Sequence, residues 1–234
     1  TLAVFVLILL TGQPIPPLEH SILGVGAGVF GALGLLLFYR AMAVTKMSVA
    51  APITAVMTGI LPVIAAIALE GTPELIQIVG MLVALAAIAF ISREDNTHIR
   101  LSEVRLPLLA GIGFGLYLTL FARASEVSPL WPVFFGRCAS VTLVGLMGWR
   151  MGVIKMPVSR VLLMMAAAGI LDTLGNALYA AATQVGRDYI AAILSSLYPA
   201  ATVGLAWLIL KERLNRVQWI GVGLAFIAIV LITL

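Results

Sequence analysis

The chain has 234 residues, of which 62% are apolar and 10% charged, with a mean hydropathy of +1.14. A soluble domain carries roughly a quarter charged residues, so this composition excludes a soluble enzyme, a DNA-binding domain and a disordered regulator. The net charge of +4 does not indicate a nucleic-acid partner, because most basic residues stand between long apolar runs, where they act as topology signals. The sole thiol, Cys138, cannot form an internal disulfide.

The first apolar run, Thr1–Thr11, would span only ~16 Å as a helix, about half of a bilayer core. We expect it to be the end of a transmembrane helix whose start is missing. Further along the chain, apolar runs near the required length of about 20 residues predict eight transmembrane helices. Helices are favoured over membrane-barrel strands because stretches such as Gly80–Ile91 are apolar on every side. The eight predicted helices cover residues 21–43, 47–69, 74–92, 106–123, 131–149, 160–183, 189–210 and 216–234.

The connections between these helices are short, so successive helices are expected to be antiparallel. Basic residues fall mainly on one side of the predicted bilayer, which the positive-inside rule assigns to the cytoplasm. Only Arg123 and Arg187 fall in connections on the other side. This distribution predicts an external C-terminus. We expect a multi-pass protein of the plasma (inner) membrane of a bacterium. The residues assigned to the cytoplasmic side are Arg40, Lys46, Arg93, Arg100, Arg105, Arg150, Lys155, Arg160, Lys211, Arg213 and Arg216.

Comparing the chain with itself reveals a repeat with an offset of 140 residues, which becomes 141 after one gap. Tyr39 matches Tyr179, Gln77 matches Gln218 and Gly80 matches Gly221. Each repeat needs five helices, so we expect an original ten, with the first helix and part of the second absent. Five is an odd number, so the two repeats lie in opposite orientations across the membrane, as in many transporters. The predicted organisation is a first repeat over residues 1–92, a connection over 93–105 and a second repeat over 106–234.

Three stretches carry a resemblance to a known family: FYRAMAVTKMSVAAPI at Phe38–Ile53, LYPA at Leu197–Ala200 and LKERLNRVQWIGVGLAFIAI at Leu210–Ile229. Together with the two repeats, they resemble the EamA-like branch of the drug/metabolite transporter superfamily. The resemblance implies a ten-helix carrier with a central cavity. It also implies that the cavity walls come largely from four helices, which correspond here to residues 21–43, 47–69, 160–183 and 189–210.

Two charged residues, Asp172 and Arg137, fall clearly inside predicted helices. A charge at the bilayer centre costs at least ~2.5–3.5 kcal/mol on insertion scales, so each requires an explanation. Asp172 begins a polar stripe with Asn176, Tyr179 and Thr183 on one helical face. Arg137 is close enough along the membrane axis to reach Asp172. The pair is either a structural link between two helices or a site of substrate binding or protonation, and the sequence leaves both open.

Other polar residues extend the candidate cavity. Ser195, Tyr198 and Thr202 share one face of the helix predicted over 189–210, and Thr54 and Thr58 share a face of the helix over 47–69. Structural roles, with hydroxyls bonded to backbone, remain an alternative for these side chains. Tyr39 and Tyr179 are candidate cavity or gate residues because the repeat pairs them, and Pro62 and Pro199 are candidate hinges. Small residues spaced four apart, Gly24 with Gly28 and Gly111 with Gly115, predict close packing between helices of the bundle.

The sequence favours a carrier over an intramembrane enzyme, since it contains no H-E-x-x-H, G-x-S-x-G or Walker motif. The expected function is secondary active transport, with export of amino acids or related small metabolites by alternating access. The export direction comes from the resemblance alone. Alternatives are a proton-coupled efflux carrier for drugs or cationic amphiphiles and a carrier for nucleotide sugars or sugar phosphates. We expect no cofactor or metal, while proton coupling remains open; the predicted partners are the lipid bilayer and a small solute, not nucleic acid.

Overall fold

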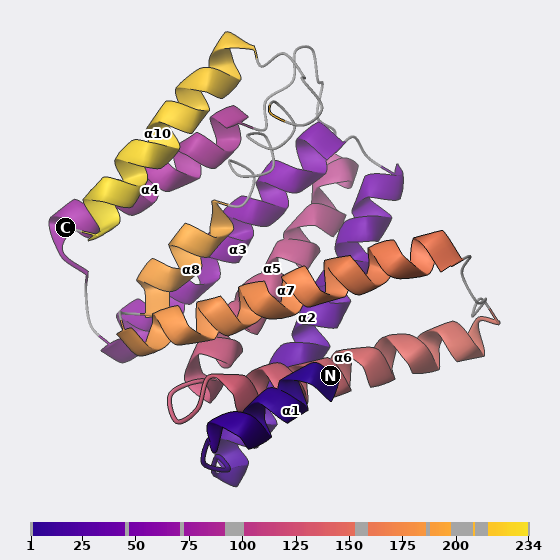
Figure 1. Cartoon of the computed structure of the whole chain (residues 1–234). Coiled ribbons are helices and arrows are strands. Elements are labelled where there is room, and N and C mark those ends of the chain that lie inside the picture. The colour runs from indigo at the N-terminus through magenta and orange to yellow at the C-terminus, as the bar shows by residue number, and fades with distance from the viewer. Residues whose placement is uncertain are drawn as a thin grey trace. The chain divides into compact units, whose positions relative to one another are not determined.

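The structure is a computed structural model, and it describes residues 2–44, 47–70, 73–91, 101–152, 159–185, 188–197, 208 and 215–233. Within these ranges the secondary structure is helical and contains no strand, which confirms the predicted all-α class. The helices in chain order are α1 (Leu2–Thr11), α2 (Leu18–Val44), α3 (Met47–Glu70), α4 (Leu75–Ile91), α5 (Leu101–Ala124), α6 (Leu130–Arg150), α7 (Ser159–Val185), α8 (Asp188–Ser196) and α10 (Arg216–Thr233) (Figure 1).

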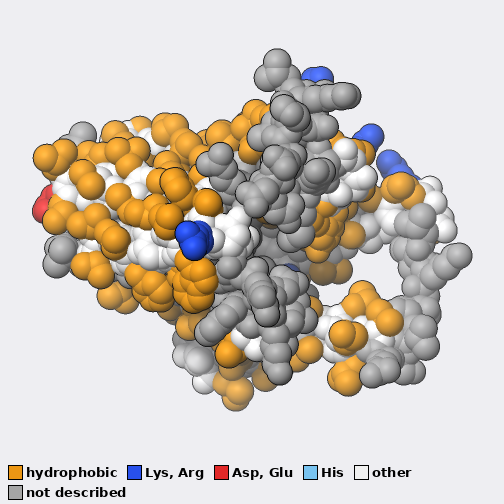
Figure 2. Space-filling model, turned by 90° about the horizontal axis from the view of Figure 1, so that it is seen from above, with side chains coloured by type: hydrophobic (Ala, Val, Ile, Leu, Met, Phe, Trp, Pro, Cys, Tyr) orange, Lys and Arg blue, Asp and Glu red, His pale blue; other side chains and the backbone are white. Residues whose placement is uncertain are grey.

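Four of these helices are long and apolar enough to cross a membrane: Leu18–Val44, Val104–Ala124, Leu130–Arg150 and Val161–Val185. Shorter apolar helical stretches lie at Ile53–Ala65, Leu75–Phe90 and Arg216–Ala228. Hydrophobic side chains cover much of the described surface on the face shown in Figure 2. Such a surface suits lipid tails, which are as apolar as leucine side chains.

The predicted helix boundaries need two corrections. Helix α5 begins at Leu101, five residues before the predicted start at 106, so part of the predicted connection is helical. The prediction followed the apolar run, whereas leucine, glutamate and arginine in this segment have high helix propensity and extend the helix beyond that run. Helix α8 ends at Ser196, within the span predicted over 189–210. The remainder of that span lies outside the described residues, apart from Leu197 and Leu208.

The chain forms two compact units that do not coincide with the two predicted sequence repeats. Unit 1 contains residues 1–32 and 120–187, and unit 2 contains residues 33–119 and 188–234. Each unit therefore combines helices from the first and the second half of the sequence. Helices α2 and α5 each contribute to both units.

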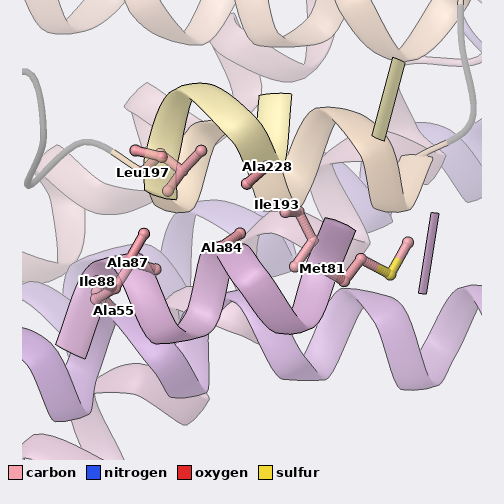
Figure 3. Close-up of a cluster of buried hydrophobic side chains, with 9 residues drawn as sticks. Ala55, Met81, Ala84, Ala87, Ile88, Ile193, Leu197 and Ala228 are labelled. Carbon is pink, nitrogen blue, oxygen red and sulfur yellow. The ribbon is translucent and has the colours of Figure 1, made fainter. Parts of the chain in front are cut away.

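Unit 2 has a core of small and branched apolar side chains from α3, α4, α8 and α10. Ala84, Ala87 and Ile88 of α4 belong to one cluster of buried side chains with Ile193 of α8 and Ala228 of α10 (Figure 3). The small alanine side chains allow α4 and α10 to lie side by side over their length (Figure 1). Helices α4 and α10 are counterparts in the 141-residue offset, and α3 and α8, which also pack together, are counterparts in the 140-residue offset.

Unit 1 is organised around α6, which packs against α1 and crosses α2 at glycines. A Cβ atom at Gly28 would lie 2.6 Å from the Cα of Gly136, and one at Gly24 would lie 3.2 Å from the Cα of Pro132. In unit 2, a Cβ at Gly111 would lie 2.7 Å from the Thr54 carbonyl oxygen. The predicted close packing at the glycine pairs is therefore confirmed within the chain.

Candidate solute-binding site

An ion pair joins the two charged residues that the sequence places inside the membrane. The Arg137 guanidinium of α6 donates a hydrogen bond to the Asp172 carboxylate of α7, which confirms the expected contact within unit 1. Asp172 is at the midpoint of the 27-residue α7. The exposed fractions of the two side chains differ, being 24% for Arg137 and 59% for Asp172.

The Arg137 guanidinium retains unused hydrogen-bonding capacity. Its Nε atom is enclosed and has no hydrogen-bond partner among the residues that the structure describes. A guanidinium has five N–H donors in a planar fork that matches a carboxylate or phosphate. The described contacts therefore leave the Nε–H donor of Arg137 unpaired inside the protein.

The polar stripe on α7 passes from an exposed to a buried environment. Asp172 is exposed, Asn176 is half-buried and Tyr179 is buried. The Tyr179 ring packs against Phe121 of α5, with 5.9 Å between the ring centroids. The Thr183 hydroxyl donates to the Ala180 carbonyl of its own helix. The polar stripe is therefore packed against unit 1 at the C-terminal end of α7, and it is exposed at Asp172.

A polar cluster at one end of unit 1 holds the helices that carry the ion pair. The side-chain oxygen of Gln13 accepts hydrogen bonds from the Ser128 hydroxyl and from the backbone N–H of Leu130, the first residue of α6. Gln13 thus caps α6 from another part of the chain, since Pro129, before the helix, makes no side-chain cap. On the other side of the same loop, the Gln184 amide of α7 donates to the Ser125 carbonyl at 2.8 Å.

Sequence reasoning missed Gln13 and Gln184 as positioning residues. Their partners lie 115 and 59 positions away in the chain, so no local pattern indicates the contacts. The readable signal is Pro129 before α6, because proline there leaves the first N–H groups of the helix without a local side-chain cap.

The remaining described candidate residues lie in unit 2. Thr54 is fully buried and its hydroxyl donates to the Pro107 carbonyl of α5 at 3.1 Å, while the Thr58 hydroxyl donates to the Thr54 carbonyl at 2.7 Å. These contacts give both threonines a structural role in the described arrangement. Ser195 is exposed on α8.

The other predictions have different outcomes. Tyr39 is 57% exposed and its repeat counterpart Tyr179 only 8%, so the paired tyrosines have different surroundings. Helix α3 continues through the buried Pro62, and a hinge there stays a prediction. Tyr198, Pro199 and Thr202 lie outside the described residues.

The fold and the ion pair define an all-helical, multi-pass membrane protein with a charged site inside a membrane-spanning helix. The EamA-like transporter family matches residues 1–93 and 102–234, and the chain belongs to this family of membrane transporters. The two matched regions agree with a two-repeat helical membrane fold.

A comparison with solved structures supports the same fold. One crystal structure of a protein superposes with a TM-score of 0.71 over 98% of this chain and 93% of the other, at 17% sequence identity. At this identity the similarity concerns the fold alone. No curated protein sequence matches the chain.

Proposed function

We propose that this protein is a secondary carrier that exports amino acids or related small metabolites across a bacterial plasma membrane, without catalysing a chemical reaction. The solute binds in a central cavity beside Arg137 and Asp172, and alternating access moves it across the bilayer. Family membership supports transport of a small molecule. The excess of basic residues in the connections on one side supports an orientation with that side in the cytoplasm.

The single observation that carries the proposal is the half-exposed ion pair in the membrane. The Asp172 side chain is 59% exposed at the middle of α7. A carboxylate facing lipid tails would cost several kcal/mol, which supports a water-filled cavity beside the exposed part of Asp172. Such a cavity with paired charges at the bilayer midplane is suited to binding a polar solute.

The charges at the site favour a solute that carries both an anionic and a cationic group. The guanidinium of Arg137 suits a carboxylate, and the exposed carboxylate of Asp172 suits an ammonium group. Amino acids have both groups on one carbon atom. A sugar phosphate carries a larger negative charge and would require more than one cation at the site.

The test is an uptake panel with the purified protein in liposomes, covering amino acids, cationic drugs and sugar phosphates, with and without a pH gradient. We expect uptake of at least one amino-acid-like solute, dependent on Arg137 and Asp172. Uptake of cationic drugs alone would replace the proposal by multidrug efflux, and uptake of sugar phosphates alone would replace it by a phosphate-ester carrier. Uptake of none by the folded protein would contradict the carrier function itself.

The pH gradient tests proton coupling at Asp172, the carboxylate that faces Arg137. If Asp172 exchanges protons during transport, an imposed gradient changes the wild-type uptake rate by a factor that is absent from the residual uptake of Asp172→Asn. Equal responses to the gradient in the two proteins would contradict a protonation role. Substrate binding at the pair would then be judged from the uptake rates alone.

A further inference from the structure

The C-terminal end of helix α7 is packed within unit 1, whereas the side chains of its N-terminal half are exposed. From Val161 to Gly175 the side chains and glycines of α7 are exposed, except for the half-buried Thr173. Leu163 and Met164, for example, are 72% and 69% exposed. Tyr179 and Ala180, by contrast, are buried.

At the packed end of α7, two described side chains contact other elements of unit 1. The Tyr179 ring contacts Phe121 of α5, and the Gln184 amide donates to the Ser125 carbonyl. The open half has one polar attachment to another element among the described residues, the ion pair of Asp172 with Arg137. Breaking this pair would leave the described part of the first half of α7 without a polar contact to α6.

The segment between the ion pair and the packed end contains a glycine that packing does not explain. A Cβ atom at Gly175 would meet nothing within 4 Å, and the same holds for Gly169. Glycines at helix crossings are different, since a Cβ at Gly28 would clash with Gly136. Glycine is the least favourable residue in a helix interior apart from proline, and it increases backbone freedom.

A second feature weakens the regularity of α7 at the same place. The Thr173 hydroxyl donates to the Gly169 carbonyl of the preceding turn at 2.6 Å. Hydroxyl groups that bond back to the carbonyl four residues earlier often bend helices. Gly169, Thr173 and Gly175 therefore surround Asp172 with a segment that bends more easily than the rest of the helix.

We propose that α7 bends at Gly175 and that the Arg137–Asp172 ion pair holds the N-terminal half of α7 against α6. The C-terminal half, from Tyr179 to Gln184, stays fixed to unit 1. When a solute's anionic group replaces the Asp172 carboxylate on Arg137, the ion pair breaks and the N-terminal half of α7 moves. This inference rests on the proposed function only in assigning the movement to the transport cycle.

The first test compares two glycine substitutions at open positions. Gly175→Ala stiffens α7 at the bend, and Gly223→Ala is the matched control in α10, where an added Cβ also meets nothing within 4 Å. Both variants should have equal or higher unfolding temperatures. Gly175→Ala should reduce the uptake rate about tenfold, whereas Gly223→Ala should transport like wild type. Equal uptake by the two variants would overturn the assigned role of the bend in transport.

The second test measures the movement without any transport. In a Cys138→Ser background, spin labels are placed at Val141 on α6 and at either Leu163 or Leu178 on α7, three exposed positions. The label-to-label distances are measured in liposomes with and without Asp172→Asn. We expect the distance from 141 to 163 to shift or broaden in Asp172→Asn, and the distance from 141 to 178 to stay.

The two tests separate failure of the bend from failure of the carrier function. If both distances are unchanged in Asp172→Asn, or if both change equally, the proposed roles of the ion pair and of the bend are wrong even if the protein transports a solute. If only the distance to position 163 changes and no solute is taken up, the bend stands as a property of α7. In that case only the proposed function is contradicted.

Discussion

At the scale of single residues, the Arg137–Asp172 pair is expected to affect both the stability of the protein and the proposed transport. Removing one partner leaves the other charge inside the membrane without compensation, which is more costly than losing the bond. In the proposed cavity this cost is limited, because water would screen the exposed part of the Asp172 carboxylate. The pair should therefore stabilise the protein less than a fully buried ion pair would.

We predict that Arg137→Ala lowers the free energy of unfolding by about 1–3 kcal/mol, between the values for exposed and buried pairs. Adding Asp172→Asn should recover part of this loss, since it removes the uncompensated carboxylate charge. Reversible unfolding in detergent, followed by circular dichroism over the double-mutant cycle, measures the coupling. Strictly additive losses would show that the two side chains do not interact energetically.

Gln13 gives a second prediction at the residue scale. Its side-chain oxygen accepts from the Leu130 N–H at 3.2 Å and also from Ser128. Gln13→Ala should cost about 1 kcal/mol of stability, the usual effect of losing a helix cap. Gln13→Glu keeps the acceptor oxygen beside the N-terminus of α6, where a negative charge is favourable, and should keep most of the stability. Equal destabilisation by both substitutions would contradict the capping role.

At the scale of helices, the close crossing of α2 and α6 depends on glycine. We predict that Gly28→Ala destabilises the protein by about 1–3 kcal/mol, because the added methyl group must push two backbones apart. The control is Gly145→Ala on α6, where an added Cβ meets nothing within 4 Å. That substitution should be neutral or stabilising, since alanine favours helices. Thermal unfolding of both variants in detergent compares them, and a stable Gly28→Ala would mean that the helices do not cross so closely.

The start of α10 shows a structural role for the glutamine that the two predicted repeats share. The Asn215 side-chain oxygen accepts from the N–H groups of Val217 and Gln218, and the Gln218 side chain accepts from the Asn215 N–H at 3.0 Å. This is a reciprocal capping box. At the start of α4, the Gln77 side chain accepts in the same way from the Glu74 N–H at 3.3 Å.

The capping box leads to a prediction for α10. Asn215→Ala should lower the free energy of unfolding by about 1 kcal/mol. Asn215→Asp should have little effect, because the carboxylate still accepts from the helix N–H groups. Hydrogen exchange at the first turn of α10 measures the change locally, and unchanged exchange in Asn215→Ala would remove the capping role.

At the scale of the whole molecule, the repeat explains the packing within unit 2. The pairs α4 with α10 and α3 with α8 relate corresponding segments of the two predicted repeats. Unit 2 therefore combines counterpart helices instead of keeping each repeat as a separate body. This arrangement explains why small residues such as Ala84 and Ala228, which allow close approach, stand at the shared core.

The sequence predicted helix positions, the close glycine contacts and the Arg137–Asp172 pair, because each depends on residue spacing within helices. It did not predict the extension of α5 to Leu101, since apolar length alone does not end a helix. It also missed the cap by Gln13, which depends on a tertiary contact between two loops. The Asn215 capping box was readable, since asparagine followed three residues later by glutamine is a helix-start signal.

The burial of Thr54 shows another limit of sequence patterns. A hydroxyl on a polar helix face indicates a cavity or a helix contact equally well. The bond from Thr54 to the Pro107 carbonyl follows from the approach of α3 to α5 at Gly111, which only the fold specifies. Residue patterns identify the polar face of a helix, while the neighbouring helix decides what that face contacts.

The most direct test of the carrier account is solute uptake by liposomes containing Asp172→Asn, measured for whichever panel solute the wild type transports. The account predicts that Asp172→Asn loses at least about 100-fold of the wild-type rate while remaining folded, and that Asp172→Glu restores part of it. A fold-loss of 100 corresponds to about 2.8 kcal/mol of lost interaction. Uptake by folded Asp172→Asn at the wild-type rate would contradict the claim that this ion pair forms the transport site.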